Sequence, residues 1–203
     1  TFKNLLTGFK YIGELITELE KQGKASDFVM GFEESYGYLA GTHARDKDAV
    51  VASMLICEMA AYYKSQGKTL IDVMNSLYDE FGYYCNTVQS YTFEGAAGME
   101  KMAAIMDGLR DNKPSSFAGY EVTKIDDYKT SKSTIVKTGE ESEITLPKSN
   151  VLAYTLTNGN KVIVRPSGTE PKIKAYITAI GQSEENAKEI AQRLLDDANE
   201  LMK

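Results

Sequence analysis

The segment RPSGTEPKIK, at residues 165–174, gathers the residue types that bind a phosphate group. It joins two runs with the alternating pattern of strands, and Ser167, Gly168 and Thr169 fall at the bend between them. Phosphate oxygens accept hydrogen bonds from hydroxyls, from the N–H groups of a tight turn and from the guanidinium fork of Arg165. Gly168 has no Cβ, so a ligand can approach the backbone closely there. These residues predict a phosphate site, and the alternative is a polar hairpin loop with solvated charges.

Two lysines follow the bend, separated by one residue. Side chains alternate between the two faces of a strand, so we expect Lys172 and Lys174 on the same face. Lys174 is the better candidate for a second cation against the phosphate, and Lys172 is the reserve.

An acidic, glycine-flanked loop lies earlier in the chain, within GFEESYGYLAGTHARDKD at residues 31–48. It follows SDFVMGF, which predicts a short buried strand, and ligands of open α/β sheets bind where strands end. The carboxylate of Glu33 can accept hydrogen bonds from sugar hydroxyls, and the hydroxyl of Ser35 can donate one to a further oxygen. The loop therefore predicts a sugar site. A solvated charged loop, an acid–base pair and a carboxylate metal site are the alternatives, although two adjacent carboxylates lack the spacing for either of the last two.

Three basic residues end this segment, namely His43, Arg45 and Lys47. They are candidates to hold a phosphate or to complete the contacts to a sugar. A zinc site normally takes three or four protein ligands, which a lone His43 does not supply. We therefore predict no metal site in this chain.

The tetrapeptide TGFK, at residues 7–10, is a third and weaker signal. A small polar turn before a helix presents backbone N–H groups to an anion, and Lys10 adds positive charge. The alternative for Lys10 is an ordinary surface lysine.

The first half of the chain has the apolar periodicity of helices. Helices are predicted at residues 9–23, 49–63, 70–82 and 96–110. Asp48 and Thr69 are the expected N-caps of the second and third. Cys57 is expected to be a buried thiol, and five methionines are expected in the core: Met54, Met59, Met99, Met102 and Met106. The tyrosines at 62, 63, 83 and 84 are expected to pack at helix ends.

The second half changes to the alternating pattern of strands. The predicted strands are GYEVTKI, STIVK, EITLP, VLAYTLT, KVIVRP and KIKAYITAI. Asn158-Gly159 predicts a hairpin between the fourth and fifth. An amphipathic helix at residues 184–202 needs a sheet to cover.

The composition changes at Asn112–Ser116, which has the residues of a linker. We therefore expect two domains. Residues 1–112 are expected to form most of a three-layer α/β domain, and residues 117–203 a smaller α+β domain whose mainly antiparallel sheet is packed by helices.

The overall composition narrows the class of protein. A net charge of -6 argues against a general nucleic-acid binder, which needs a surplus of Lys and Arg. No apolar run approaches the roughly 20 residues that span a bilayer. Two cysteines, Cys57 and Cys85, are too few for a disulfide framework, so a reducing cytoplasm is expected. The chain starts in the middle of a motif without Met, and we expect it to be a fragment.

In this order, TGFK, GFEES with the downstream HARDKD, and RPSGTEPKIK resemble three loops of the α-D-phosphohexomutase family. This family includes phosphoglucomutases and phosphomannomutases. Phe32 and the TGFK opening look more like the bacterial phosphoglucomutase branch than the phosphomannomutase branch. The resemblance extends over nearly the whole chain.

The resemblance implies roles for the matching residues. Glu33 and Ser35, helped by Lys47, would bind sugar hydroxyls, and Thr7 and Gly8 would line the same cleft. The phosphate that is not being transferred would be held by Arg165, Ser167, Gly168, Thr169 and Lys174. Lys174 stands where many relatives have Arg, which keeps the charge but loses the guanidinium fork.

The resemblance also implies what this chain lacks. The family's catalytic serine, in a TASHNP-like loop, and its magnesium-binding DxDxDR loop are absent from the 203 residues. Family members have four domains, so the chain would hold most of the third and all of the fourth. We expect this fragment alone to be inactive, with a hexose phosphate and the missing N-terminal domains as its partners.

A whole enzyme of this family would move a phosphoryl group between O1 and O6 of glucose. The resemblance implies a phosphoserine, a glucose 1,6-bisphosphate intermediate and Mg²⁺. Because the intermediate must turn around, the linker at Asn112–Ser116 is a candidate hinge. The alternatives are a phosphomannomutase or phosphoglucosamine mutase fragment, or a non-catalytic phosphosugar-binding module.

Overall fold

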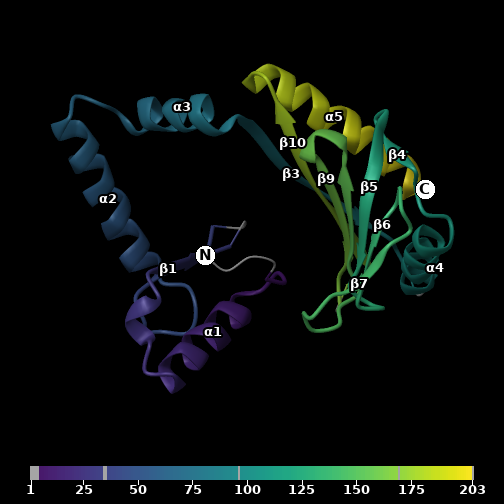
Figure 1. Cartoon of the computed structure of the whole chain (residues 1–203), viewed down its shortest axis with the longest axis horizontal. Helices are drawn as coiled ribbons and strands as arrows, with labels where there is room; N and C mark the ends of the chain where they lie inside the picture. Colours follow the sequence, from purple (N-terminus) through teal and green to yellow (C-terminus); the bar gives the residue numbers. More distant parts are fainter. Residues whose placement is uncertain (1–4, 34–35, 96, 169, 203) are drawn as a thin grey trace. The chain divides into compact units, whose positions relative to one another are not determined.

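The chain forms two compact units, residues 1–76 and residues 77–203 (Figure 1). The computed structural model describes residues 5–33, 36–95, 97–168 and 170–202. This division differs from the expected one near residue 112, and the sheet of the second unit gives the reason.

The first unit combines helices with one small sheet. Its elements are α1 (Phe9–Lys21), the 3-10 helix η1 (Ala25–Asp27), β1 (Met30–Phe32), β2 (Tyr38–Ala40), α2 (Ala49–Ser65) and the start of α3 (Leu70–Phe81). β1 and β2 are antiparallel, with Gly31 opposite Leu39. The buried core of this unit consists of Phe9, Ile12, Ile16 and Leu39.

The helix ends in this unit follow the capping residues in the sequence. Asp48 precedes α2, and its Oδ1 accepts hydrogen bonds from the N–H groups of Val50 (2.9 Å) and Val51 (3.1 Å). Thr69 and Asp72 cap α3 reciprocally: the Asp72 N–H donates to Thr69 Oγ1 at 3.2 Å, and the Thr69 N–H donates to Asp72 Oδ2 at 2.8 Å. Both predicted caps are confirmed because these side chains satisfy N–H groups that a helix leaves unpaired.

Several apolar residues of the first unit are exposed, against expectation. β1 is not a buried strand, since Met30 and Phe32 are exposed. No residue of α2 is buried, so the predictions of a buried Cys57 and of Met54 and Met59 in the core are wrong. The physical reason is that the described residues of this unit offer only the β1–β2 sheet, which is too small to cover an apolar helix.

The second unit is built on one antiparallel sheet. Its strands are β3 (Tyr83–Thr92), β4 (Ser116–Phe117), β5 (Tyr120–Asp127), β6 (Lys132–Ile135), β7 (Glu141–Glu143), β8 (Leu152–Leu156), β9 (Lys161–Pro166) and β10 (Lys172–Gly181). The strand order is β3-β10-β9-β8-β5-β6-β7, and β4 pairs with β5. This confirms the predicted antiparallel sheet.

Two helices complete this unit, α4 (Ala97–Asp111) and α5 (Glu184–Leu201) (Figure 1). They share one core with the buried side of the sheet, where Ile173 and Ile177 of β10 meet Leu194 of α5. Met102 and Met106 of α4 belong to this core, whereas Met99 is exposed. The prediction that the apolar side of the C-terminal helix covers a sheet is therefore confirmed.

The hairpin predicted from Asn158-Gly159 is present between β8 and β9. Asn158 (φ 67°) and Gly159 (φ 80°) both have left-handed backbone conformations, which Asn and Gly adopt most readily. The Leu156 N–H donates to the Asn160 carbonyl at 2.8 Å and closes the turn.

The unexpected strand β3 explains the position of the boundary between the units. Tyr83 and Tyr84 begin this strand rather than ending a helix, and β3 pairs with β10 along its whole length. α4 packs into the same core. The predicted linker Asn112–Ser116 therefore lies inside the second unit, between α4 and β5, and a hinge between the two units does not fall there.

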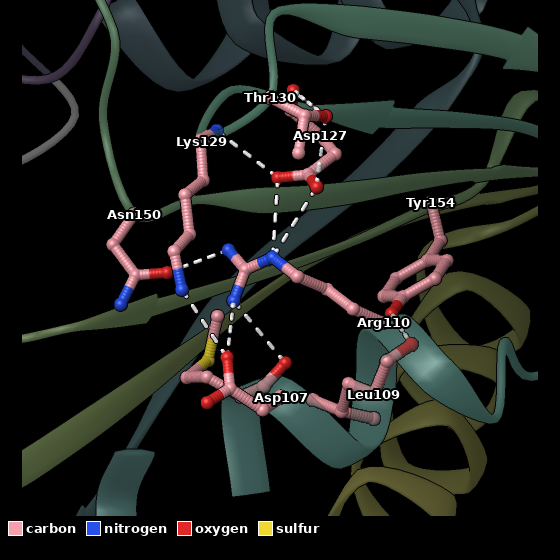
Figure 2. Close-up of polar contacts among 9 residues, drawn as sticks. Asp107, Leu109, Arg110, Asp127, Lys129, Thr130, Asn150 and Tyr154 are labelled. Atoms are coloured by element: carbon pink, nitrogen blue, oxygen red, sulfur yellow. Dashed lines mark hydrogen bonds and ion pairs between the residues drawn. The ribbon is translucent and has the colours of Figure 1, made fainter. Parts of the chain in front are cut away.

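A polar network fastens α4 to the sheet (Figure 2). The Arg110 side chain, 13% exposed, donates from Nε to both carboxylate oxygens of Asp127 at 3.2 and 3.3 Å. Its Nη2 donates to Asn150 Oδ1 at 2.6 Å. The hydroxyl of the buried Tyr154 donates to the Leu109 carbonyl at 3.4 Å, and burial raises the pKa of Tyr154. These contacts pair buried polar groups at the end of α4.

No helix among the described residues is both long and apolar enough to cross a lipid bilayer.

Candidate functional site

The RPSGTEPKIK segment forms the connection between β9 and β10, the third and second strands from the β3 edge of the sheet. Arg165 lies directly opposite Lys174 in the strand register. The turn is closed by the Ser167 N–H, which donates to the Lys172 carbonyl at 2.7 Å. The Glu170 N–H donates to Ser167 Oγ at 3.2 Å. The predicted strand–turn–strand context is therefore present.

The opposed cations Arg165 and Lys174 carry the chemical argument. Directly opposed side chains in a sheet are only about 5 Å apart at Cβ, where like charges destabilise the pair. Within the described ranges, neither side chain makes an ion pair, and Lys174 is exposed. Lys172 differs, because its Nζ lies 3.3 Å from Glu170 Oε2. An anion between Arg165 and Lys174 would relieve their repulsion.

The turn beside these cations is open. A Cβ placed on Gly168 would meet no heavy atom within 4 Å, so packing in the described chain does not require glycine there. The space is available for a ligand to approach the backbone. Thr169 lies outside the described residues.

The acidic loop of the first unit brings Glu33 and Lys47 together. Lys47 Nζ lies 3.8 Å from Glu33 Oε2, and the Glu33 side chain is only 14% exposed. The loop is closed by the Glu33 N–H, which donates to the Gly37 carbonyl at 2.8 Å. Glu34 and Ser35 lie outside the described residues.

The start of α1 lies beside this pair. Lys47 Nζ is 5.4 Å from the centre of the Phe9 ring, and Phe9 directly follows Thr7 and Gly8. Gly8 precedes α1 with φ 132° and gives the helix no side-chain cap. Lys10 is exposed, and its Nζ lies 4.9 Å from the Tyr11 ring centre. The TGFK turn therefore contributes to the surroundings of Lys47 through Phe9.

Arg45, a predicted ligand residue, makes several contacts within the first unit. Its Nη1 donates to the carbonyls of Thr42 (2.7 Å) and Ala44 (3.0 Å), and its Nε donates to Thr17 Oγ1 at 3.3 Å. Its Nη2 pairs with Glu20. These contacts tie the loop before α2 to α1 and occupy much of the guanidinium group.

His43 is likewise engaged with the fold. Its Nε2 lies 2.8 Å from Asp48 Oδ2, on the carboxylate that caps α2. This hydrogen bond, followed by the N–H groups of Val51 and Val50, holds the pKa of Asp48 below its ordinary value. The geometry thus separates Lys47, which faces Glu33, from the two neighbouring basic residues.

Sequence reasoning missed three residues of this site: Phe9, Gly37 and Asp46. Asp46 Oδ1 lies 2.9 Å from Lys47 Nζ, and this hydrogen bond is the largest cause that raises the pKa of Lys47. Gly37 is buried against the lysine stem. Phe9 lies within TGFK, and Gly37 and Asp46 lie within the segment at 31–48, but nothing in these motifs singles out the three residues.

Carboxylates in the described part of the chain do not gather into a metal site. No group of three or more His, Cys, Asp or Glu side chains there is placed to hold an ion.

Comparison with known protein families assigns most of the chain to two domains of one family. Residues 1–81 match the model of the phosphoglucomutase/phosphomannomutase alpha/beta/alpha domain III. Residues 100–197 match the model of the C-terminal domain of the same family. The chain belongs to the phosphoglucomutase/phosphomannomutase family, and it carries the third and C-terminal domains of that family.

Curated relatives agree with this assignment. The chain is 41% identical over 177 residues to a phosphoglucomutase of Staphylococcus epidermidis, covering 87% of this chain and 32% of the relative. It is 40% identical over 178 residues to a phosphoglucomutase of Staphylococcus haemolyticus, covering 88% of this chain and 32% of the relative. The chain thus spans about a third of the length of these relatives.

A solved structure supports the fold. The chain is similar to an open form of the exocytosis-sensitive phosphoprotein pp63/parafusin, a phosphoglucomutase from Paramecium, with a TM-score of 0.63 and 18% identity. The match covers 97% of this chain and 32% of that chain.

Proposed function

We propose that this chain is the phosphosugar-recognition half of a phosphoglucomutase. The parent enzyme would interconvert glucose 1-phosphate and glucose 6-phosphate through a phosphoserine and glucose 1,6-bisphosphate. The observation that carries this proposal is the opposed pair Arg165 and Lys174 beside an open glycine turn, in a family whose substrates are sugar phosphates. The family model also includes phosphomannomutases, and the similarity to phosphoglucomutases of Staphylococcus favours glucose.

In this proposal the phosphate loop holds the phosphoryl group that is not being transferred. The guanidinium group of Arg165 would donate two parallel hydrogen bonds, and the ammonium group of Lys174 would supply a second positive charge. The hydroxyls of Ser167 and Thr169 and the turn backbone at Gly168 would complete the grip. All these groups bind and orient, and none of them forms a bond to phosphorus.

The loop of the first unit would hold the hexose. The carboxylate of Glu33 would accept hydrogen bonds from ring hydroxyls, with Ser35 and Lys47 contacting further oxygens. Thr7 and Gly8 would line the same site. Contacts of this kind bind a sugar in more than one orientation, which suits an intermediate that must present either phosphate for transfer.

The cofactors belong to the parent enzyme in this proposal. Mg²⁺ offsets charge on a transferring phosphoryl group, but the described residues offer no cluster of ligands that fits it. Its ligands and the reactive serine would lie in the N-terminal domains, which are the proposed partners of this chain. We also propose that the parent works in the cytoplasm, in keeping with the unpaired thiols of Cys57 and Cys85.

A titration of the labelled chain with glucose 6-phosphate, followed by amide chemical shifts, tests the proposal. We expect shifts around both Glu33 and Arg165, larger than those caused by inorganic phosphate or mannose 6-phosphate. Shifts near Arg165 alone, of equal size for the two sugar phosphates and inorganic phosphate, would mean that this chain binds phosphate without recognising the sugar. No shift at either loop up to millimolar ligand would contradict binding by this chain.

The same preparation tests the expected inactivity. A coupled assay for glucose 6-phosphate formation from glucose 1-phosphate is expected to show no turnover, because the chain lacks the serine and magnesium loops. Turnover by a preparation free of host mutase would refute the proposal that catalysis needs the N-terminal domains.

A further inference from the structure

The ammonium group of Lys47 lies between two carboxylates that differ in exposure. Its Nζ is 2.9 Å from Asp46 Oδ1 and 3.8 Å from Glu33 Oε2. The Asp46 side chain is 75% exposed, whereas that of Glu33 is 14% exposed. The hydrogen bond therefore goes to the exposed carboxylate, and the contact to Glu33 is longer than hydrogen-bond length.

Asp46 holds Lys47 at both ends. The same Oδ1 atom accepts a hydrogen bond from the backbone N–H of Lys47 at 2.8 Å and contacts its Nζ. The side-chain hydrogen bond is the largest cause that lowers the pKa of Asp46, followed by the backbone one. One carboxylate oxygen thus turns the lysine side chain back toward its own backbone.

Gly37 provides the space for the lysine stem. A Cβ on Gly37 would lie 2.3 Å from Lys47 Cδ, 2.7 Å from Lys47 Cγ and 2.9 Å from Glu33 Oε2. The backbone of Gly37 is outside the left-handed region, so its conformation does not itself demand glycine. What glycine contributes here is room between the lysine stem and the acidic side chain.

We propose that Asp46 and Gly37 are positioning residues for Lys47. Gly37 admits the stem of Lys47 beside Glu33, and Asp46 keeps the ammonium group from closing onto the Glu33 carboxylate. Shortening the 3.8 Å Lys47–Glu33 ion pair to a hydrogen bond would occupy a Glu33 acceptor that a sugar hydroxyl needs. Asp46 therefore keeps the Glu33 carboxylate available, a consequence for ligand binding that rests on the function proposed above.

Asp46→Asn tests this role, because two explanations predict opposite signs. Removing a negative charge near an anionic ligand should tighten glucose 6-phosphate binding if Asp46 acts only through charge. If Asp46 positions Lys47, the freed ammonium group closes onto Glu33 and binding weakens, by about two- to fivefold in Kd. The probe is glucose 6-phosphate, titrated by amide shifts of the 203-residue chain.

Two further variants serve as controls. Asp46→Glu restores a carboxylate and is expected to recover at least half of the lost affinity. Asp27→Asn removes one exposed negative charge in the same unit, from a side chain that makes no hydrogen bond or ion pair with the other described residues. Tighter binding or unchanged binding in Asp46→Asn would overturn the proposal.

A measurement without ligand separates this inference from the proposed function. Nuclear Overhauser contacts between the Lys47 ε-methylene and the Glu33 γ-methylene are expected to strengthen in Asp46→Asn. In Gly37→Ala, the new methyl group should displace the lysine stem and weaken the contact between Lys47 and the Phe9 ring. Unchanged contacts in both variants would refute the positioning role even if the wild-type chain binds the sugar phosphate. If the wild type binds nothing but the contacts change as described, the positioning survives and the proposed function fails.

Discussion

The two candidate binding loops are held by structures that differ in the size of their sheets and buried cores. The connection at Arg165–Lys174 joins two neighbouring strands of a sheet whose single core includes helices α4 and α5. The Glu33 loop rests on the two-stranded β1–β2 sheet and on α1, with a core of four buried apolar side chains, of which only Ile16 and Leu39 are fully buried. Nearby, α2 has no buried residue.

This difference has a physical consequence for binding. Strand pairing on both sides of β10 fixes the backbone of Arg165 and Lys174 before any ligand arrives, so little backbone ordering entropy remains to be lost there. The Glu33 loop is closed by the hydrogen bond from the Glu33 N–H to the Gly37 carbonyl, and Asp46 and Lys47 beside it are exposed. We therefore expect phosphate recognition to be a property of the second unit alone, and sugar recognition to depend on more of the parent chain.

Two truncations to alanine, one in each unit, test whether the second unit has the more complete core. Leu194→Ala in α5 removes a side chain with no exposed surface and is expected to cost about 3–4 kcal/mol of unfolding free energy. Met54→Ala in α2 removes a side chain that is 54% exposed and should change stability by less than about 0.5 kcal/mol. Urea unfolding, read from amide signals of each unit, measures both, and similar costs would contradict the difference in support.

Arg110→Ala tests whether the second unit is also fastened by polar contacts (Figure 2). The variant leaves Asp127, which is 16% exposed, without its guanidinium partner. We expect a loss of about 2–3 kcal/mol, because a largely buried charge is left unpaired. Arg193→Ala is the matched control, since that exposed side chain donates to one carbonyl, that of Ala118. Equal losses in urea unfolding would show that the network adds nothing beyond a surface contact.

Much of the fold followed from local patterns in the sequence. The alternation in β8, β9 and β10, the Asn158-Gly159 turn and the apolar stripe of α5 each reported a structure that forms from nearby residues. β3 was missed because only Gly82 separates it from α3 and its exposed face carries Asn86, Val88 and Ser90. Its partner β10 lies some ninety residues away, and no local pattern reveals such a pairing.

The site was predictable in residue type but not in pairing. The motifs pointed to Arg165, Lys174, Glu33 and Lys47, and the structure shows the cross-strand opposition of the first two. No spacing rule distinguishes Lys47, which faces Glu33, from Arg45, which fastens the loop to α1. The difference between the two residues depends on the position of α1 beside the loop, which is set by tertiary packing.

Arg165→Gln tests whether the second unit binds phosphate through the loop between β9 and β10. We expect about tenfold weaker binding of inorganic phosphate, because the variant loses a charge-assisted, two-pronged contact. Lys161→Gln is the control, since Lys161 is an exposed cation on the same strand, near its other end. Titration followed by amide shifts of the second unit measures both. Equal weakening in the two variants would mean that phosphate responds to general charge and not to the loop.

The smallest expected effect concerns acid, and it contrasts the caps of α2 and α5. The cap of α2 is the Asp48 carboxylate, whose pKa is lowered first by the His43 hydrogen bond. A lowered folded-state pKa means that the carboxylate stabilises the helix above the ordinary aspartate pKa of about 3.9, and that this contribution is lost as the pH falls through the lowered value. The cap of α5 is the Ser183 hydroxyl, which accepts a hydrogen bond from the Asn186 N–H at 3.2 Å and does not titrate there.

Below about pH 4 we therefore expect the Val50 and Val51 amide signals to move toward uncapped positions, while the Asn186 amide moves less. Glu185 in the first turn of α5 also has a lowered pKa, chiefly through its own backbone N–H, so some response of that helix is expected. Asp48→Ser replaces the titrating cap of α2 by a neutral one and should remove the acid response at Val50 and Val51. A persistent response in that variant would show that the acid sensitivity of the first unit arises from its incomplete core and not from its cap.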